Sequence, residues 1–143
     1  MPILALALIL TLTGIAALHA YWGLGGRWPA HDEATLADMV IGKTPGGRMP
    51  PPVPCFAVAA AILAGVGLVG LVSFMAMPDP WMGLARVGYW IFAAVFVARG
   101  AAGYIPALWR RSAGTAFVRL NTRYYSPLCL LLGAGLIANL LGR

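Results

Sequence analysis

The chain has 143 residues, of which 61% are hydrophobic and 10% are charged, and its formal net charge is +6. A soluble domain carries about 25% charged residues, so this composition excludes an ordinary soluble protein. The basic residues flank apolar runs, which favours contact with anionic lipid and gives no support to nucleic-acid binding.

Four long apolar runs predict the fold. A helix needs about 20 residues to cross the hydrocarbon core of a bilayer, and no run alternates with the period of two expected of a barrel strand. We therefore predict an all-α integral membrane protein in which residues 1–143 form one domain. It is an antiparallel bundle of four transmembrane helices with a long proline-rich loop between the first two. The predicted spans are residues 3–23, 55–77, 84–104 and 125–141.

The first apolar run leads into this long loop. The run has no basic residue before it and exceeds the roughly 7–15 apolar residues of a signal peptide, so we expect a mature helix. Residues 32–41 predict a short helix with Leu36, Met39 and Val40 on one face. Because proline fixes φ and removes a donor, residues 43–54 are predicted to be extended, either as a lid over this end of the bundle or hanging free.

The later connections and the helix contacts can also be predicted. Residues 78–80, Pro-Asp-Pro, predict a tight turn between the second and third spans, and residues 112–115 predict a break near the membrane surface. Small residues at helical spacing let helices approach closely, although the same rows could mark a face for another protein. The rows are Ala61 and Gly65 in the second span, Ala94, Ala98 and Ala102 in the third, and Ala134 and Ala138 in the fourth.

The distribution of basic residues predicts the orientation in a bacterial inner membrane. Residues 105–123 contain four arginines and no acidic residue, and residues 24–54 contain three basic residues. Basic residues mark the cytoplasmic side, so we predict cytoplasmic loops at 24–54 and 105–124 and both termini outside. Aromatic rings favour the membrane interfaces, and the outer one is expected to hold Trp81, Tyr89 and Trp90.

The predicted spans contain few groups that could do chemistry. They hold no Asp or Glu, which argues against a carboxylate-based enzyme and against a proton-coupled exporter that uses a membrane acid. Two histidines and two cysteines form no zinc-binding pattern, so the sequence predicts no metal site and gives little support to a haem. The cysteines form no CxxC and imply no disulfide framework, and the sequence indicates no cofactor.

Ionisable and aromatic residues gather at the end of the bundle that carries the two long loops. His19 and Trp22 are three residues apart and share a helix face. Ser126 and Pro127 predict the start of the fourth helix, whose free N–H groups near Arg123 could hold an anion. Each residue also has a structural explanation, such as an aromatic belt or a snorkelling arginine. The predicted ligand-binding residues are His19, Trp22, Gly26, Trp28, Arg99, Asn121, Arg123, Tyr124, Tyr125 and Cys129.

Two segments at this end resemble a known family. Residues 19–28 read His-x-x-Trp-x-x-Gly-Gly-x-Trp, and residues 119–129 read Arg-Leu-Asn-Thr-Arg-Tyr-Tyr-Ser-Pro-Leu-Cys. They are similar to small bacterial four-helix membrane proteins of the family called domain of unknown function 3995. The resemblance extends over nearly the whole chain and implies a fold but no activity. It also implies Asp at the position of Asn121, so a function that needs this acid would be lost here.

Three kinds of function are open at this point. The leading hypothesis is a non-enzymatic protein that binds a lipid-like or anionic ligand at its cytoplasmic end, or an accessory subunit of a larger membrane complex. The alternative is a membrane-embedded enzyme acting on a lipid or quinone, with His19 as general acid or base, Tyr124 as a second proton donor, and Arg123 and Arg99 stabilising negative charge. It requires His19 and Arg123 to lie close together and face a cavity. A third is a channel or transporter, which would have to be a homo-oligomer because four spans enclose no wide pore.

Overall fold

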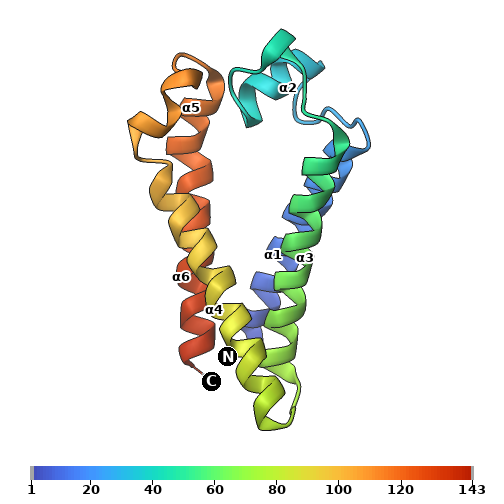
Figure 1. The fold of residues 1–143 in the computed structure, drawn as a ribbon, viewed down its shortest axis with the longest axis vertical. Helices are drawn as coiled ribbons and strands as arrows, with labels where there is room; N and C mark the ends of the chain where they lie inside the picture. The colour runs from blue at the N-terminus through green and yellow to red at the C-terminus, as the bar shows by residue number, and fades with distance from the viewer. Residues whose placement is uncertain (1, 143) are drawn as a thin grey trace.

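The computed structural model describes residues 2–142, and within that range every regular element is a helix (Figure 1). Four helices are long and apolar enough to cross a membrane, and they indicate a membrane protein. They correspond to the four predicted apolar runs. They are α1 (Pro2–Gly23), α3 (Pro52–Phe74), α4 (Asp79–Ala102) and a continuous helix, Ala116–Leu141, made of α5 (Ala116–Leu120), the π-helical turn η3 (Asn121–Tyr125) and α6 (Ser126–Leu141).

The connection between α3 and α4 differs from the prediction. The predicted span 84–104 corresponds to α4, which begins earlier, at Asp79. The predicted turn between the two spans therefore lies a little earlier than residues 78–80, because Pro80 is already in the first turn of α4, where a proline needs no backbone donor. Asp79 is favoured at the same place by the helix dipole. Residues 75–78 form the connection instead.

The long helices form two pairs that touch near one end and separate toward the other (Figure 1). α1 packs along α3, and α4 packs along α6. Between the pairs, a Leu8 methyl lies 3.2 Å from the position that a Cβ on Gly135 would take, and the Phe92 ring packs directly on Gly65. Because both glycines lack a Cβ, the neighbouring side chain can approach the helix backbone. The joined end contains the start of α1 and the end of α6.

A buried hydrogen-bonded group links three helices near the joined end. The Asn139 side chain of α6 is fully buried, and its Nδ2 atom donates to Ser73 Oγ of α3 and to Tyr89 Oη of α4, each at 3.0 Å. Tyr89 has no exposed surface, so its predicted place in an interfacial belt is wrong. A tyrosine hydroxyl needs a polar partner, and here Asn139 provides it inside the protein.

Most of the predicted small-residue rows do not form the helix contacts. Of their members, Gly65 is buried, but the close approaches between α4 and α6 occur at other glycines, with Leu130 packed on Gly100 and Val97 on Gly133. Helical spacing shows that small residues share a face, but it does not show which face meets the partner. The exposed members of the predicted rows are Ala61, Ala94, Ala98, Ala134 and Ala138.

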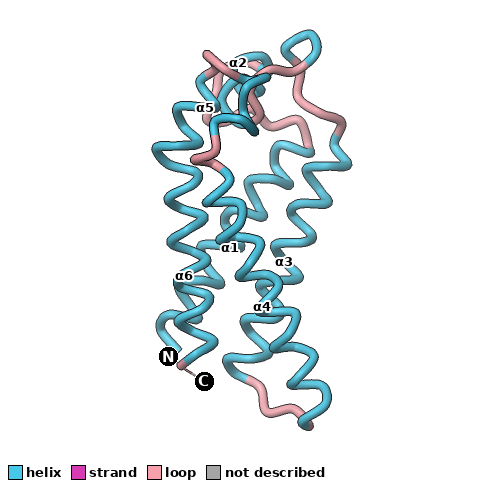
Figure 2. Tube along the Cα trace, turned by 60° about the vertical axis from the view of Figure 1, so that its left-hand side comes forward, coloured by secondary structure: helices cyan, strands magenta, loops and turns pink. Residues whose placement is uncertain are grey.

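The loop after α1 is held at the open end of the molecule and does not hang free. Its predicted short helix is confirmed as α2 (Glu33–Val40), which begins with Asp32 accepting a hydrogen bond from Thr35 N at 2.8 Å. Leu36 is buried, and α2 contacts α5. Figure 2 shows α2 and α5 together at one end of the molecule. The chain then reaches α3 through the short turn η1 (Pro45–Gly47), and the loop after α4 contains a second short turn, η2 (Pro106–Ser112).

Candidate functional site

The end of α1 brings together three of the predicted site residues. His19 Nδ1 donates to Ile15 O of its own helix at 2.9 Å, and its ring meets the Trp22 ring edge-on with 5.2 Å between centroids. Trp22 Nε1 donates to Trp28 O at 2.8 Å. These contacts fix the path of the chain as it leaves α1.

Gly26 serves the local fold of this segment. The Tyr21 ring packs so closely on Gly26 that a Cβ would not fit. Gly26 and Trp22 also line a hollow of about 360 Å³ that is bordered by Arg27 and Glu33, both of which are exposed. This hollow is a feature of the loop surface and not of the space between the helix pairs.

A second cluster forms where α4 ends beside the fourth long helix. Arg99 Nη2 donates to Asn121 Oδ1 at 2.7 Å, and the guanidinium carbon lies 5.4 Å from the centroid of the Trp109 ring. Asn121 is fully buried, and its Nδ2 atom donates to Gly103 O at 3.4 Å. Arg99 Nη1 is buried and has no hydrogen-bond partner among residues 2–142. An amide and an aromatic face therefore hold this charge.

The fourth long helix begins at Ala116 and not at Ser126 as predicted. Residues 121–125 form a π-helical turn, and Ser126 N donates to Asn121 O across it. The wider turn carries the helix past Pro127, whose ring and missing donor would disrupt a regular α-helix. The N–H groups that were predicted to be free for an anion lie inside a helix, and residues 116–124 are not part of a loop.

Arg123 and Tyr124 are exposed and join neither cluster. The Arg123 guanidinium carbon lies 5.6 Å from the centroid of the adjacent Tyr124 ring. Tyr125 is half-buried, and its hydroxyl donates to Met39 O of α2 at 3.1 Å. His19 belongs to one helix pair and Arg123 to the other, so the structure does not bring together the residues that the enzyme hypothesis requires.

The facing sides of the two helix pairs lose contact toward the loops. On α3, Gly65 is buried, but Val58, two turns nearer the loops on the same face, is 43% exposed. On α6, Gly135 contacts the other pair, but Leu128, two turns nearer the loops, is 41% exposed. We call these apolar surfaces, with the exposed Ala61 of α3, the inner faces. They lie between the joined end and α2.

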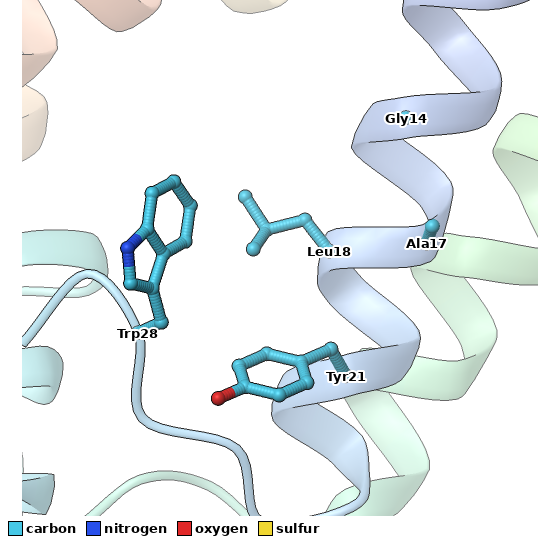
Figure 3. Close-up of a pocket in the computed structure, with 5 residues that line it drawn as sticks. All are labelled: Gly14, Ala17, Leu18, Tyr21 and Trp28. Carbon is cyan, nitrogen blue, oxygen red and sulfur yellow. The ribbon is translucent and has the colours of Figure 1, made fainter.

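A separate hollow of about 590 Å³ lies along α1. Figure 3 shows Leu18, Tyr21 and Trp28 around one open space, with Gly14 and Ala17 on the helix beside it. Its walls are mostly apolar, and the two rings carry polar tips, an arrangement favoured at the edge of the hydrocarbon core. The hollow is open at the side.

Sequence reasoning missed residues that organise this end of the molecule. Trp109 Nε1 donates to Ala102 O at 2.8 Å, and Asp38 of α2 accepts a hydrogen bond from Ala116 N at 3.0 Å. A tryptophan beside arginines is typical of an interfacial belt, and an aspartate on a short helix is typical of a solvated face. Cys129, by contrast, was among the predicted site residues, and it is half-buried on α6 with a free thiol.

Comparison with known proteins gives one match. Residues 12–136 match the family described as "Protein of unknown function (DUF3995)", and the match includes parts of all four long helices. No curated protein and no solved structure matches the chain. The chain therefore belongs to the DUF3995 family, as the resemblance of residues 19–28 and 119–129 implied.

Proposed function

We propose that this is a multi-pass protein of the bacterial inner membrane that binds one long-chain, lipid-like molecule between its two helix pairs. In this proposal the four long helices cross the membrane as an antiparallel bundle. The loops after α1 and α4 lie in the cytoplasm and both termini lie outside, an orientation supported by the distribution of arginines. The ligand lies against the inner faces, below α2.

The exposure of the inner faces carries the proposal. Val58 and Leu128 are both about two-fifths exposed, although each lies only two turns from a position where the pairs touch. Empty space beside apolar side chains forfeits their dispersion contacts, so hydrocarbon fills such a gap in a bilayer. A hydrocarbon chain between the inner faces is contacted by protein on both sides, whereas a lipid on the outer surface is contacted on one side only.

Arg99 favours a ligand with an anionic head. It lies two turns beyond Phe92 on the same face of α4, at the loop end of the inner faces. Its Nη1 atom has no partner among the described residues. In a medium of low dielectric constant a charge is weakly screened, so a phosphate or carboxylate head near Arg99 is attracted strongly.

Native mass spectrometry of the protein, taken gently from its own membrane, tests the proposal. We expect a lipid-like molecule bound to the wild-type protein and recoverable by extraction. Ala61→Phe places a ring on the inner face and should reduce the bound fraction several-fold. Ala60→Phe makes the same change at the exposed neighbouring residue, on a different face of α3, and should leave the bound fraction unchanged. Equal lipid content in the two variants, or a wild-type protein with nothing bound, would overturn the proposal.

A role as an accessory subunit, or self-association, is supported by a different observation. Small residues at helical spacing are exposed on α4, at Ala94 and Ala98, and on α6, at Ala134 and Ala138. Such rows allow the helix of another protein to approach closely. The same native mass spectra distinguish the two functions, because a stoichiometric protein partner that is lost in Ala98→Leu and kept in Ala60→Leu would support the subunit role.

A further inference from the structure

The fourth long helix is not capped by its own residues. Thr115 precedes it with the extended backbone of a cap, but the Thr115 side chain caps no N–H group. Its Oγ1 atom donates to Ser112 O at 2.7 Å instead. The first N–H groups of a helix need acceptors, so this helix depends on an acceptor from elsewhere in the chain.

Asp38 of α2 provides that acceptor. Its Oδ2 atom accepts a hydrogen bond from Ala116 N at 3.0 Å, across 78 positions of sequence. A carboxylate in this place gains both a charge-assisted hydrogen bond and a favourable interaction with the helix dipole. Asp38 thus connects the loop between α1 and α3 to the first turn of the other helix pair.

Other contacts join the same two regions. Tyr125 Oη donates to Met39 O at 3.1 Å, and Lys43 N donates to Ser112 Oγ at 3.3 Å. Gly42, with a φ of 94°, packs so closely on Ser112 that a Cβ would not fit. Residues 39–43, at the end of α2 and just after it, are therefore seated on η3 and on the loop before α5.

We propose that Asp38 is a positioning residue that holds α2 across the open end of the two helix pairs and thereby slows exchange of the ligand. The inference rests on the proposed function, since the ligand is the molecule between the inner faces. The loop leaves α1 and returns to α3, so seating α2 on α5 ties the pairs together where their long helices have separated. Glycines with positive φ lie on both sides of α2, at Gly25 and Gly46, and give the loop the freedom to move when the contact breaks.

Hydrogen–deuterium exchange and lipid uptake together test this inference. We expect Asp38→Ala to speed exchange of the Ala116 amide and of the α2 amides roughly tenfold, the change expected for losing a cap worth about 1.4 kcal/mol. It should also speed uptake of pyrene-labelled phosphatidylglycerol from donor vesicles. Glu33→Ala is the matched control, because Glu33 also accepts a backbone hydrogen bond, from Met49 N, but within its own loop. It should leave exchange at Ala116 and lipid uptake unchanged.

A second variant distinguishes simple capping of the helix from the proposed link between α2 and the helix that begins at Ala116, which we call the clasp. Adding Thr115→Asp to Asp38→Ala gives the helix a cap of its own at the Phe117 or Val118 N–H group. Exchange across the first turn of the helix should therefore slow again while the α2 amides and lipid uptake stay fast. If the local cap restored all three rates, or if Asp38→Ala left the α2 amides unchanged, the clasp would be disproved. A wild-type protein that takes up no labelled lipid would instead count against the proposed function. The hydrogen–deuterium exchange data would still show whether Asp38 holds α2 in place.

Discussion

Two buried asparagines form hydrogen bonds with other polar groups inside this apolar molecule. Asn121 accepts a hydrogen bond from Arg99, and Asn139 donates to Ser73 and Tyr89. The Asn121 amide uses both its acceptor and its donor, whereas the Asn139 amide uses its donor and its buried Oδ1 atom has no hydrogen-bond partner among residues 2–142. Removing either amide takes a hydrogen bond from groups that stay buried, which costs more than the bond itself contributed.

Asn121→Ala should lower the free energy of unfolding by about 2 kcal/mol, because it removes a hydrogen bond to a charged group and leaves Arg99 in place. Thermal unfolding in one detergent measures the change. Thr122→Ala is the control, since Thr122 is exposed and its hydroxyl donates only to Val118 O of the same helix. Equal effects of the two substitutions would show that the Arg99 contact does not stabilise the protein.

The start of α2 should depend on pH through Asp32. Hydrogen bonds from the Thr35 N–H and hydroxyl to the carboxylate lower the pKa of Asp32 from its ordinary value of 3.8. Because the pKa of Asp32 is lower in the folded state than in the unfolded state, the hydrogen bonds to its carboxylate stabilise the start of α2 fully above pH 3.8. They are lost as the pH falls through the lower pKa of the folded state. The Thr35 amide proton shift, followed by NMR, should show a midpoint below 3.8. Asp32→Asn should abolish the midpoint, and a midpoint above 3.8 would contradict the expectation.

At the scale of elements, the π-helical turn η3 decides how the fourth long helix presents its polar side chains. A π turn contains one residue more than an α turn. Within it Asn121 is fully buried beside Ser126, and Tyr125 reaches α2, while Thr122, Arg123 and Tyr124 remain exposed. The extra residue thus changes which side chains of this segment face the protein.

In a Pro127→Ala background, which removes the need for the wider turn, deleting Thr122 should be tolerated better than deleting Leu131. Loss of one residue from η3 converts the π turn to an α turn, so the residues on either side keep the faces that they now present. A deletion at Leu131 instead rotates all preceding residues of the helix by about 100° relative to α4. Purified yield and the midpoint of thermal unfolding measure the difference. Equal loss of folded protein in both deletions would argue against the π turn.

The elements that could be predicted are those with local signals. The four apolar runs and the pattern of the short helix at residues 32–41 are signals that act within a few residues, and the helices that they predict are confirmed. Ser126 and Pro127 gave a wrong helix start because the same pair suits either a start or a widened turn. What decides between them is distant in sequence, since buried Ser126 packs against Gly103 of α4.

At the scale of the whole molecule, two helix pairs are joined at one end and tied by α2 at the other (Figure 1). Composition predicts how deep each residue lies in its span, but it does not show which helices pair. His19 and Arg99 were predicted at one end of the bundle, and the structure places them on separate pairs. The Arg99 contact with Asn121 depends on the packing of α4 along the fourth long helix, which no local pattern encodes.

Asn139→Leu should weaken the joined end. The leucine has similar volume but leaves the Ser73 and Tyr89 hydroxyls without this partner, so we expect a loss of about 1–3 kcal/mol in the free energy of unfolding. Ala138→Leu, at the exposed neighbouring residue, should stay within about 0.5 kcal/mol of wild type. Adding Ser73→Ala to Asn139→Leu should restore part of the loss, and failure to restore any of it would point to packing as the cause.

The exposed inner faces also determine how the occupancy of the proposed site should be described. If the proposed function holds, a molecule that reaches the exposed Val58 and Leu128 from the side arrives by lateral diffusion within the bilayer and never crosses water. Its occupancy then depends on its mole fraction among the surrounding lipids and not on its aqueous concentration. Adding unlabelled membrane to a fixed amount of protein and ligand would dilute the ligand and empty the site, even though the volume of the sample had not changed.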